Sequence, residues 1–111
     1  MRIITHDDGR CLTLRLLGEL DHAAAPEATP CLEDAVEEYL PRRCVLDLSG
    51  LSFMDSSGIG MLLGRYKTIR FVGGTMAAIN VKERMRRVLL LSGVYKVIDI
   101  YEGLPQPSKL L

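Results

Sequence analysis

The stretch that decides the fold is Leu51-Ser52-Phe53-Met54-Asp55-Ser56-Ser57-Gly58-Ile59-Gly60. A short apolar run precedes it and apolar residues follow it at helical spacing, so we expect a strand to pass into a helix here. Asp and Ser are among the best N-cap residues, each worth roughly 1 kcal/mol over Ala. One cap needs one such residue, whereas this stretch has three in a row. A helix N-terminus carries unpaired N–H groups and a partial positive charge, which suit an anion or a phosphorylated hydroxyl.

The flanking sequence predicts alternating strands and helices. Arg2 to Thr5 and Cys11 to Leu17 flank Asp7-Asp8-Gly9, a pattern typical of an antiparallel hairpin. Later strands are expected at 44–48, 75–79 and 97–100. Apolar residues recur at helical spacing within 23–40, 59–69 and 81–92. The order predicts an α/β fold with a small mixed, mainly parallel sheet and an N-terminal antiparallel hairpin.

Several boundaries follow from prolines and small polar residues. Pro30 removes a backbone donor, so the first regular helix is expected to begin near Pro30, with Pro26 in an irregular lead-in. Ser49-Gly50 is expected to break the strand at 44–48, and Asn80 to cap the helix within 81–92. Pro105 and Pro107 exclude a regular helix at the start of the tail.

Length and charge limit the class of protein. The chain has 111 residues and a net charge of zero, which predicts one globular domain over residues 1–111. Without a basic, aromatic-rich stripe, direct binding to nucleic acid is not expected. Residues 1–41 carry three Arg against nine Asp and Glu, and the remaining residues carry the opposite excess. Solvated helix faces explain this pattern, and an acidic partner surface is the alternative.

Cys11, Cys31 and Cys44 are widely spaced, with no C-x-x-C pair. They predict neither a disulfide framework nor a metal site, and buried free thiols in the cytosol are the default. We expect no signal peptide, because the residues after Met1 do not form an apolar run, and no apolar run in the sequence approaches the ~20 residues that a membrane span needs. We therefore expect a cytoplasmic protein without membrane attachment.

Two kinds of active site are poorly supported around the serines. The G-x-S-x-G nucleophile elbow is absent, and His6 and His22 are the only imidazole bases in the sequence. Gly58-Ile59-Gly60 lacks both the lysine of a phosphate loop and a third glycine. No catalytic residue and no cofactor are therefore expected. Tyr39 and Tyr66 fit apolar helix faces and are expected in the core.

Asp21 and His22 form a second candidate site, in Gly18-Glu19-Leu20-Asp21-His22. This segment follows a strand and precedes a helix, so a simple turn explains it. Loops at the carboxyl ends of parallel strands gather at one edge of the sheet. If the two preceding strands are parallel neighbours, Asp21 lies close to Asp55 and Ser56.

These segments, together with Leu63-Gly64-Arg65-Tyr66-Lys67, Gly73-Gly74 and Ser92-Gly93, resemble the STAS domains of bacterial anti-sigma factor antagonists. Within that family they are most similar to the antagonists of the sporulation anti-sigma-F factor. The resemblance runs from the hairpin to about Ile100, and its D-S-S-G-I-G block is specific. It implies a sheet with helices packed largely on one face.

The resemblance also implies a regulatory protein that is not an enzyme. In such proteins the first serine of D-S-S-G, here Ser56, is phosphorylated by a partner that is both serine kinase and anti-sigma factor. The unphosphorylated form binds this partner and frees a sigma factor, and a serine phosphatase resets the phosphorylated form. Asp21, Asp55, Ser57 and Gly58 are expected at the partner-binding surface, with Gly58 keeping Ser56 accessible. A competing possibility is an anion- or nucleotide-binding STAS module without a kinase partner.

Overall fold

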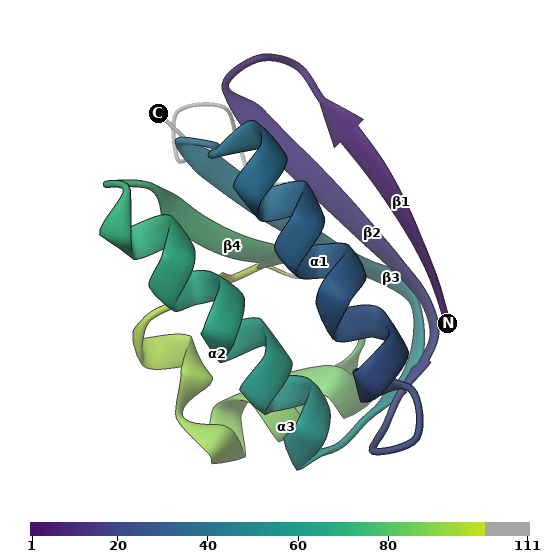
Figure 1. Ribbon diagram of the computed structural model, residues 1–111. Helices are drawn as coiled ribbons and strands as arrows, with labels where there is room; N and C mark the ends of the chain where they lie inside the picture. The colour runs from purple at the N-terminus through teal and green to yellow at the C-terminus, as the bar shows by residue number, and fades with distance from the viewer. Residues whose placement is uncertain (102–111) are drawn as a thin grey trace.

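The computed structural model describes residues 1–101 as a five-stranded sheet with three α-helices (Figure 1). The sheet order is β1-β2-β3-β4-β5; β1 and β2 are antiparallel, and the other neighbours are parallel. This confirms the predicted fold class. The elements in chain order are β1 (Arg2–Asp7), β2 (Cys11–Leu20), α1 (Ala25–Tyr39), β3 (Arg43–Met54), α2 (Ser56–Phe71), β4 (Thr75–Ile79), α3 (Glu83–Ser92), the short 3-10 helix η1 (Val94–Lys96) and β5 (Asp99–Ile100).

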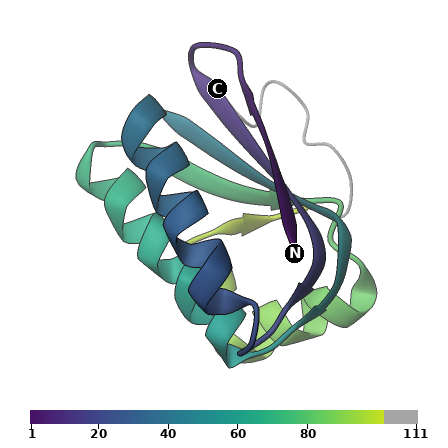
Figure 2. The same cartoon turned by 45° about the vertical axis from the view of Figure 1, so that its right-hand side comes forward.

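Helices α1 and α2 lie side by side on one face of the sheet, and α3 lies behind the N-terminal part of α2 (Figures 1 and 2). The core between these layers follows from the two periods of the sequence. Alternate strand residues and the inner helix faces supply it, chiefly Leu12, Leu14, Leu16, Leu46, Leu48, Leu32, Val36, Leu62 and Ile69. Each such side chain contributes about 1.5–3 kcal/mol when fully buried.

The N-terminal hairpin forms as predicted. Gly9 has φ +95°, and its N–H donates to Asp7 Oδ1 at 3.0 Å. Asp8 Oδ1 accepts from the N–H groups of Cys11 at 2.8 Å and Arg10 at 3.2 Å. These two bonds hold the pKa of the Asp8 carboxyl below its usual value. The turn therefore fixes the pairing of Arg2 with Leu17 at the far end of the hairpin.

The first helix begins earlier than its prolines suggest. It starts at Ala25, with Pro26 in its first turn and Pro30 inside it, so the predicted start near Pro30 is wrong. Pro30 removes only one hydrogen bond close to a helix end that already lacks several. Burial of Leu32 and Val36 against the sheet offsets that loss.

Strand β3 does not end at Ser49-Gly50. It continues to Met54, and β2 continues to Leu20, so the predicted break is wrong. The pairing of β2 with β3 shifts register on both sides of Leu17, which marks bulges rather than strand ends. A Cβ at Gly50 would overlap the Leu17 side chain, so glycine permits this close approach.

Other local predictions had mixed outcomes. Asn80 does not cap α3; it has φ +55°, and its Nδ2 donates to Asp47 Oδ1 at 3.1 Å. Tyr39 is exposed, whereas Tyr66 is half-buried against the core. The last strand is shorter than predicted. The predictions for Pro105 and Pro107 lie outside the described residues.

The three cysteines differ in environment. Cys44 is buried, Cys11 is half-buried and Cys31 is exposed, so the default of buried thiols fails for Cys31. Burial raises the pKa of the Cys44 thiol to about 12. Across residues 1–101, no helix has both the length and the apolar character that crossing a membrane requires.

Candidate functional site

The candidate site lies where β2 and β3 end. Leu20 and Met54, the last residues of these parallel strands, are paired. The β2–α1 loop and the start of α2 therefore emerge together, at the lower end of the molecule in Figure 1. Extension of both strands beyond their predicted ends creates this edge.

Asp55 caps α2 with one carboxylate oxygen. Its backbone is extended, and Oδ1 accepts from the N–H groups of Ser57 at 2.9 Å and Gly58 at 3.4 Å. Such a cap is worth about 1 kcal/mol. Two of the unpaired N–H groups of the helix terminus are thereby occupied.

The other oxygen of Asp55 reaches the neighbouring loop. Oδ2 accepts from the His22 N–H at 3.1 Å, and the Asp55 N–H donates to the Leu20 carbonyl at 3.4 Å. Sequence reasoning missed this link, because it depends on the register of β2 against β3. The structure thus brings the segment that contains Asp21 beside the helix that begins at Ser56.

Asp21 organises the β2–α1 loop. Its Oδ1 accepts from the Ala24 N–H at 2.9 Å, and its carbonyl accepts from Ala24 at 3.2 Å and Ala25 at 3.0 Å. The side chain therefore fixes the turn that leads into α1. Asp21 is half-buried, and the adjacent His22 is exposed.

The two serines differ in exposure. Ser56 is the first residue of α2 and is exposed, whereas Ser57 is half-buried. Neither His6 nor His22 hydrogen-bonds to either serine within the part of the chain that the structure describes. Among residues 1–101, no cluster of three or more His, Cys, Asp and Glu side chains is arranged to hold a metal ion.

Gly58 faces the protein interior. A Cβ at this position would lie 2.7 Å from Met54 Cγ and 2.8 Å from the Leu20 carbonyl oxygen. Its hydrogen atom allows α2 to approach the ends of β2 and β3 closely. The sequence predicted that Gly58 keeps Ser56 accessible and did not predict this packing role.

Phe53 is an exposed aromatic residue beside the site that sequence reasoning did not single out. It lies one residue before the end of β3, pairs with Glu19 and is 42% exposed. The sequence signal that could have identified it is an aromatic residue next to Asp55, at a strand position that faces away from the core.

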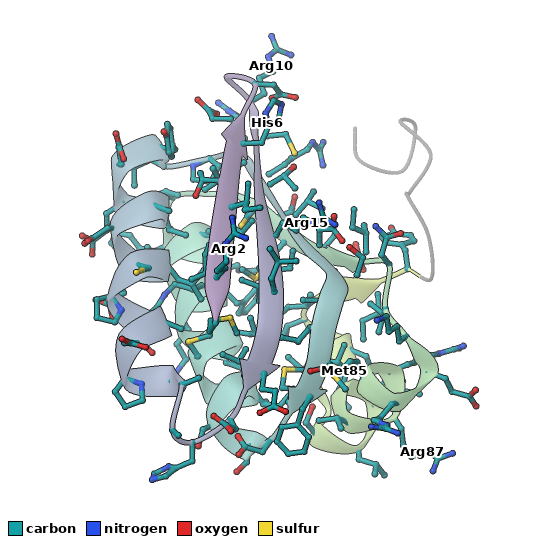
Figure 3. The ribbon with its side chains drawn as sticks, turned by 90° about the vertical axis from the view of Figure 1, so that its right-hand side faces the viewer. Arg2, His6, Arg10, Arg15, Met85 and Arg87 are labelled. Carbon is teal, nitrogen blue, oxygen red and sulfur yellow. The ribbon has the colours of Figure 1, made fainter. Side chains whose placement is uncertain are left out.

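Helix α3 exposes its arginines Arg84, Arg86 and Arg87, and it also borders a hollow. An open cavity of about 710 Å³ is lined by Val81, Glu83, Arg86, Arg87, Leu90 and Leu91. Arg87 points outward from α3 in Figure 3, and Leu91 is 83% exposed. This hollow lies apart from the cap of α2.

Comparison with known proteins identifies the family. The STAS domain model matches residues 2–106. The anti-sigma F factor antagonist of Paenibacillus polymyxa is 42% identical over 92 residues, which cover 83% of this chain and 79% of that protein. The solved anti-sigma factor antagonist SpoIIAA in its unphosphorylated form is 30% identical, with a TM-score of 0.65, over 81% of this chain and 83% of that one. The phosphorylated form of the Bacillus cell fate determinant SpoIIAA is 27% identical, with a TM-score of 0.68, over 97% and 95%. The chain belongs to the STAS domain family.

Proposed function

We propose that this chain is an anti-sigma factor antagonist whose binding to an anti-sigma factor is switched off by phosphorylation of Ser56. The observation that carries the proposal is an exposed serine at the first position of α2, held beside the Asp21 loop. The names of the relatives at 42% and 30% identity support the antagonist function. The similar SpoIIAA structures, in unphosphorylated and phosphorylated forms, support a phosphate switch.

Ser56 suits a kinase better than Ser57 does. A kinase must enclose the accepting hydroxyl, and Ser56 is exposed while Ser57 is half-buried. The Ser57 N–H is also bonded to Asp55, which restrains its backbone. Asp21 lies in the β2–α1 loop and Asp55 at the start of α2, and both add negative charge to the edge where β2 and β3 end. Ser57 and Gly58 support the same surface from within the first turn of the helix.

The phosphate acts mainly on the partner. It adds nearly two negative charges. The N–H groups of Ser57 and Gly58 already donate to Asp55, so they are not free to hold the phosphate, contrary to the expectation from a bare helix terminus. The helix dipole and water still stabilise the charge on an exposed side chain. The cost therefore arises when the partner covers this surface, where like charges brought together cost several kcal/mol.

The proposed cellular role rests on the similarity to anti-sigma F factor antagonists. The partner is an anti-sigma factor that is also a serine kinase, and binding to it frees a sigma factor of RNA polymerase. A serine phosphatase restores the binding form. The chain itself catalyses no reaction, binds neither nucleic acid nor membrane, and works in the cytoplasm as a regulator of transcription during sporulation.

The test is incubation with the anti-sigma factor kinase of the same organism and ATP, followed by mapping of the phosphate. We expect one phosphate on Ser56. Ser56→Ala should accept none and still bind the kinase, because the substitution adds no charge. Ser57→Ala is the matched control and should still accept phosphate. Phosphate on Ser57, or none on the wild-type protein, would contradict the proposal.

A further inference from the structure

We infer that Asp55 is a positioning residue that fixes the β2–α1 loop against the start of α2, and that the partner binds only this fixed arrangement. The inference rests on the proposed function, because it concerns the surface that contains Asp21 and Ser56. It assigns Asp55 a role inside the protein rather than a direct contact with the partner.

The two oxygens of the Asp55 carboxylate join different elements. Oδ1 binds the first turn of α2 through two N–H groups, and Oδ2 binds the loop through the His22 N–H at 3.1 Å. A helix cap alone needs only the first oxygen. The second bond spans 33 positions of sequence and links the segments that contain Asp21 and Ser56.

Gly58 and Leu20 bring the same elements together. The Leu20 carbonyl accepts the Asp55 N–H at 3.4 Å, and it lies 2.8 Å from where a Cβ of residue 58 would be. No side chain at position 58 therefore fits between α2 and the end of β2. The close approach of the backbones places His22 within reach of Asp55.

Asp55 has little capacity left for a partner. Its carboxylate is half-buried and accepts three backbone N–H groups. Asp21 likewise bonds its own turn through Oδ1. The Asp55–His22 bond therefore completes the fixed placement of Asp21 beside Ser56 that the Leu20–Met54 pairing and the Asp55 N–H to Leu20 carbonyl bond begin. Loss of that bond adds an ordering cost to complex formation.

The bond can be removed without changing Asp55. The turn at residues 21–24 is closed by the Ala24 N–H and the Asp21 carbonyl at 3.2 Å, which makes His22 its second residue. Proline is favoured at that position of a type I turn. His22→Pro deletes the donor N–H, and His22→Ala is the matched control that loses the same exposed side chain but keeps the N–H.

The measurement is the affinity of the unphosphorylated full chain for the kinase, by calorimetry. We expect His22→Ala to bind within about twofold of wild type and His22→Pro about tenfold more weakly, the effect of one hydrogen bond to a charged group. Asp55→Asn keeps a capping oxygen, but its amide nitrogen cannot accept from His22. It should also bind about tenfold more weakly, and the double variant should lose no more than either single variant.

Equal affinity of His22→Pro and His22→Ala would overturn the inference, since a direct contact of Asp55 with the partner predicts that result. Amide hydrogen exchange on the free proteins gives a readout that needs no partner. The N–H groups of Ala24 and Ala25 should exchange faster in His22→Pro and Asp55→Asn than in His22→Ala, and unchanged exchange would also overturn it. Failure of the wild-type chain to bind the kinase would instead refute the proposed function.

Discussion

Gly58 and Gly60 lie two positions apart in α2 and meet different surroundings. Gly58 is buried, and a Cβ there would lie within 3 Å of Met54 and Leu20 atoms. Gly60 is exposed, and a Cβ there would have nothing within 4 Å. The same residue type thus permits close packing at one position and only lowers helix propensity at the other.

This difference predicts opposite effects of alanine. Gly58→Ala should destabilise the fold by about 1–3 kcal/mol, because the helix must move away from β2 and β3. Gly60→Ala should stabilise it by about 0.5–1 kcal/mol, because alanine restricts the unfolded chain more and favours the helix. Urea denaturation of both variants tests this. Equal stabilities would show that Gly58 has no packing role.

At the scale of elements, Asp47 of β3 links this strand to β2 and to Asn80, the residue that follows β4. Its Oδ1 accepts from the Ser49 N–H at 3.0 Å and from Asn80 at 3.1 Å, and its Oδ2 lies 3.9 Å from Arg15 Nε. Arg15 lies on the sheet face opposite α1 in Figure 3. Partial burial raises the pKa of Asp47, but the bonds from Ser49 and Asn80 outweigh it and hold the pKa below its usual value.

The lowered pKa fixes the sign of a pH effect. Asp47 stabilises the fold at pH values above its unfolded pKa of about 3.9, and this contribution is lost as the pH falls through the folded pKa. Asp47→Asn should therefore lower the melting temperature at pH 7. The melting temperature of this variant should also decrease less than that of wild type when the pH is lowered. Asp34→Asn, on the exposed side of α1, is the control and should follow wild type. Parallel pH curves for wild type and Asp47→Asn would contradict this assignment.

Sequence patterns predicted the bounds of an element correctly where turn-forming residues flank it on both sides. The strand Thr75–Ile79 has the predicted bounds, since Gly73-Gly74 precedes it and Asn80 follows. The extension of β3 could not be predicted, because Gly50 acts through Leu17 on another strand. Likewise, the sequence predicts the cap by Asp55, but the bond from His22 to Asp55 could be predicted only if the register of β2 against β3 were known.

At the scale of the whole molecule, the acidic and basic residues of the uneven charge pattern lie on two different helix surfaces. The acidic excess includes exposed residues of α1, namely Glu27, Asp34, Glu37 and Glu38, and basic residues line the outer side of α3. The side chain of Arg65 in α2 is 11% exposed, and its Nη2 lies 3.5 Å from Glu33 Oε1 of α1. The two helices over the sheet are thus joined by charge as well as by apolar packing.

The junction of β2, β3, α1 and α2 is held by backbone and carboxylate bonds that leave Ser56 outside. A phosphate there can remain in water while the fold stays unchanged. The proposed switch then depends on the charge that the proposed partner would meet, and it requires no rearrangement of this chain.

The affinity of the kinase for the two forms of the chain tests this account most directly. The unphosphorylated and Ser56-phosphorylated proteins should be titrated against the same kinase, with hydrogen exchange of each free form in parallel. We predict that the phosphorylated form binds at least about 100-fold more weakly, or about 2.8 kcal/mol, with unchanged exchange outside the first turn of α2. Equal affinities would contradict the switch, and widespread changes in exchange would contradict its local electrostatic origin.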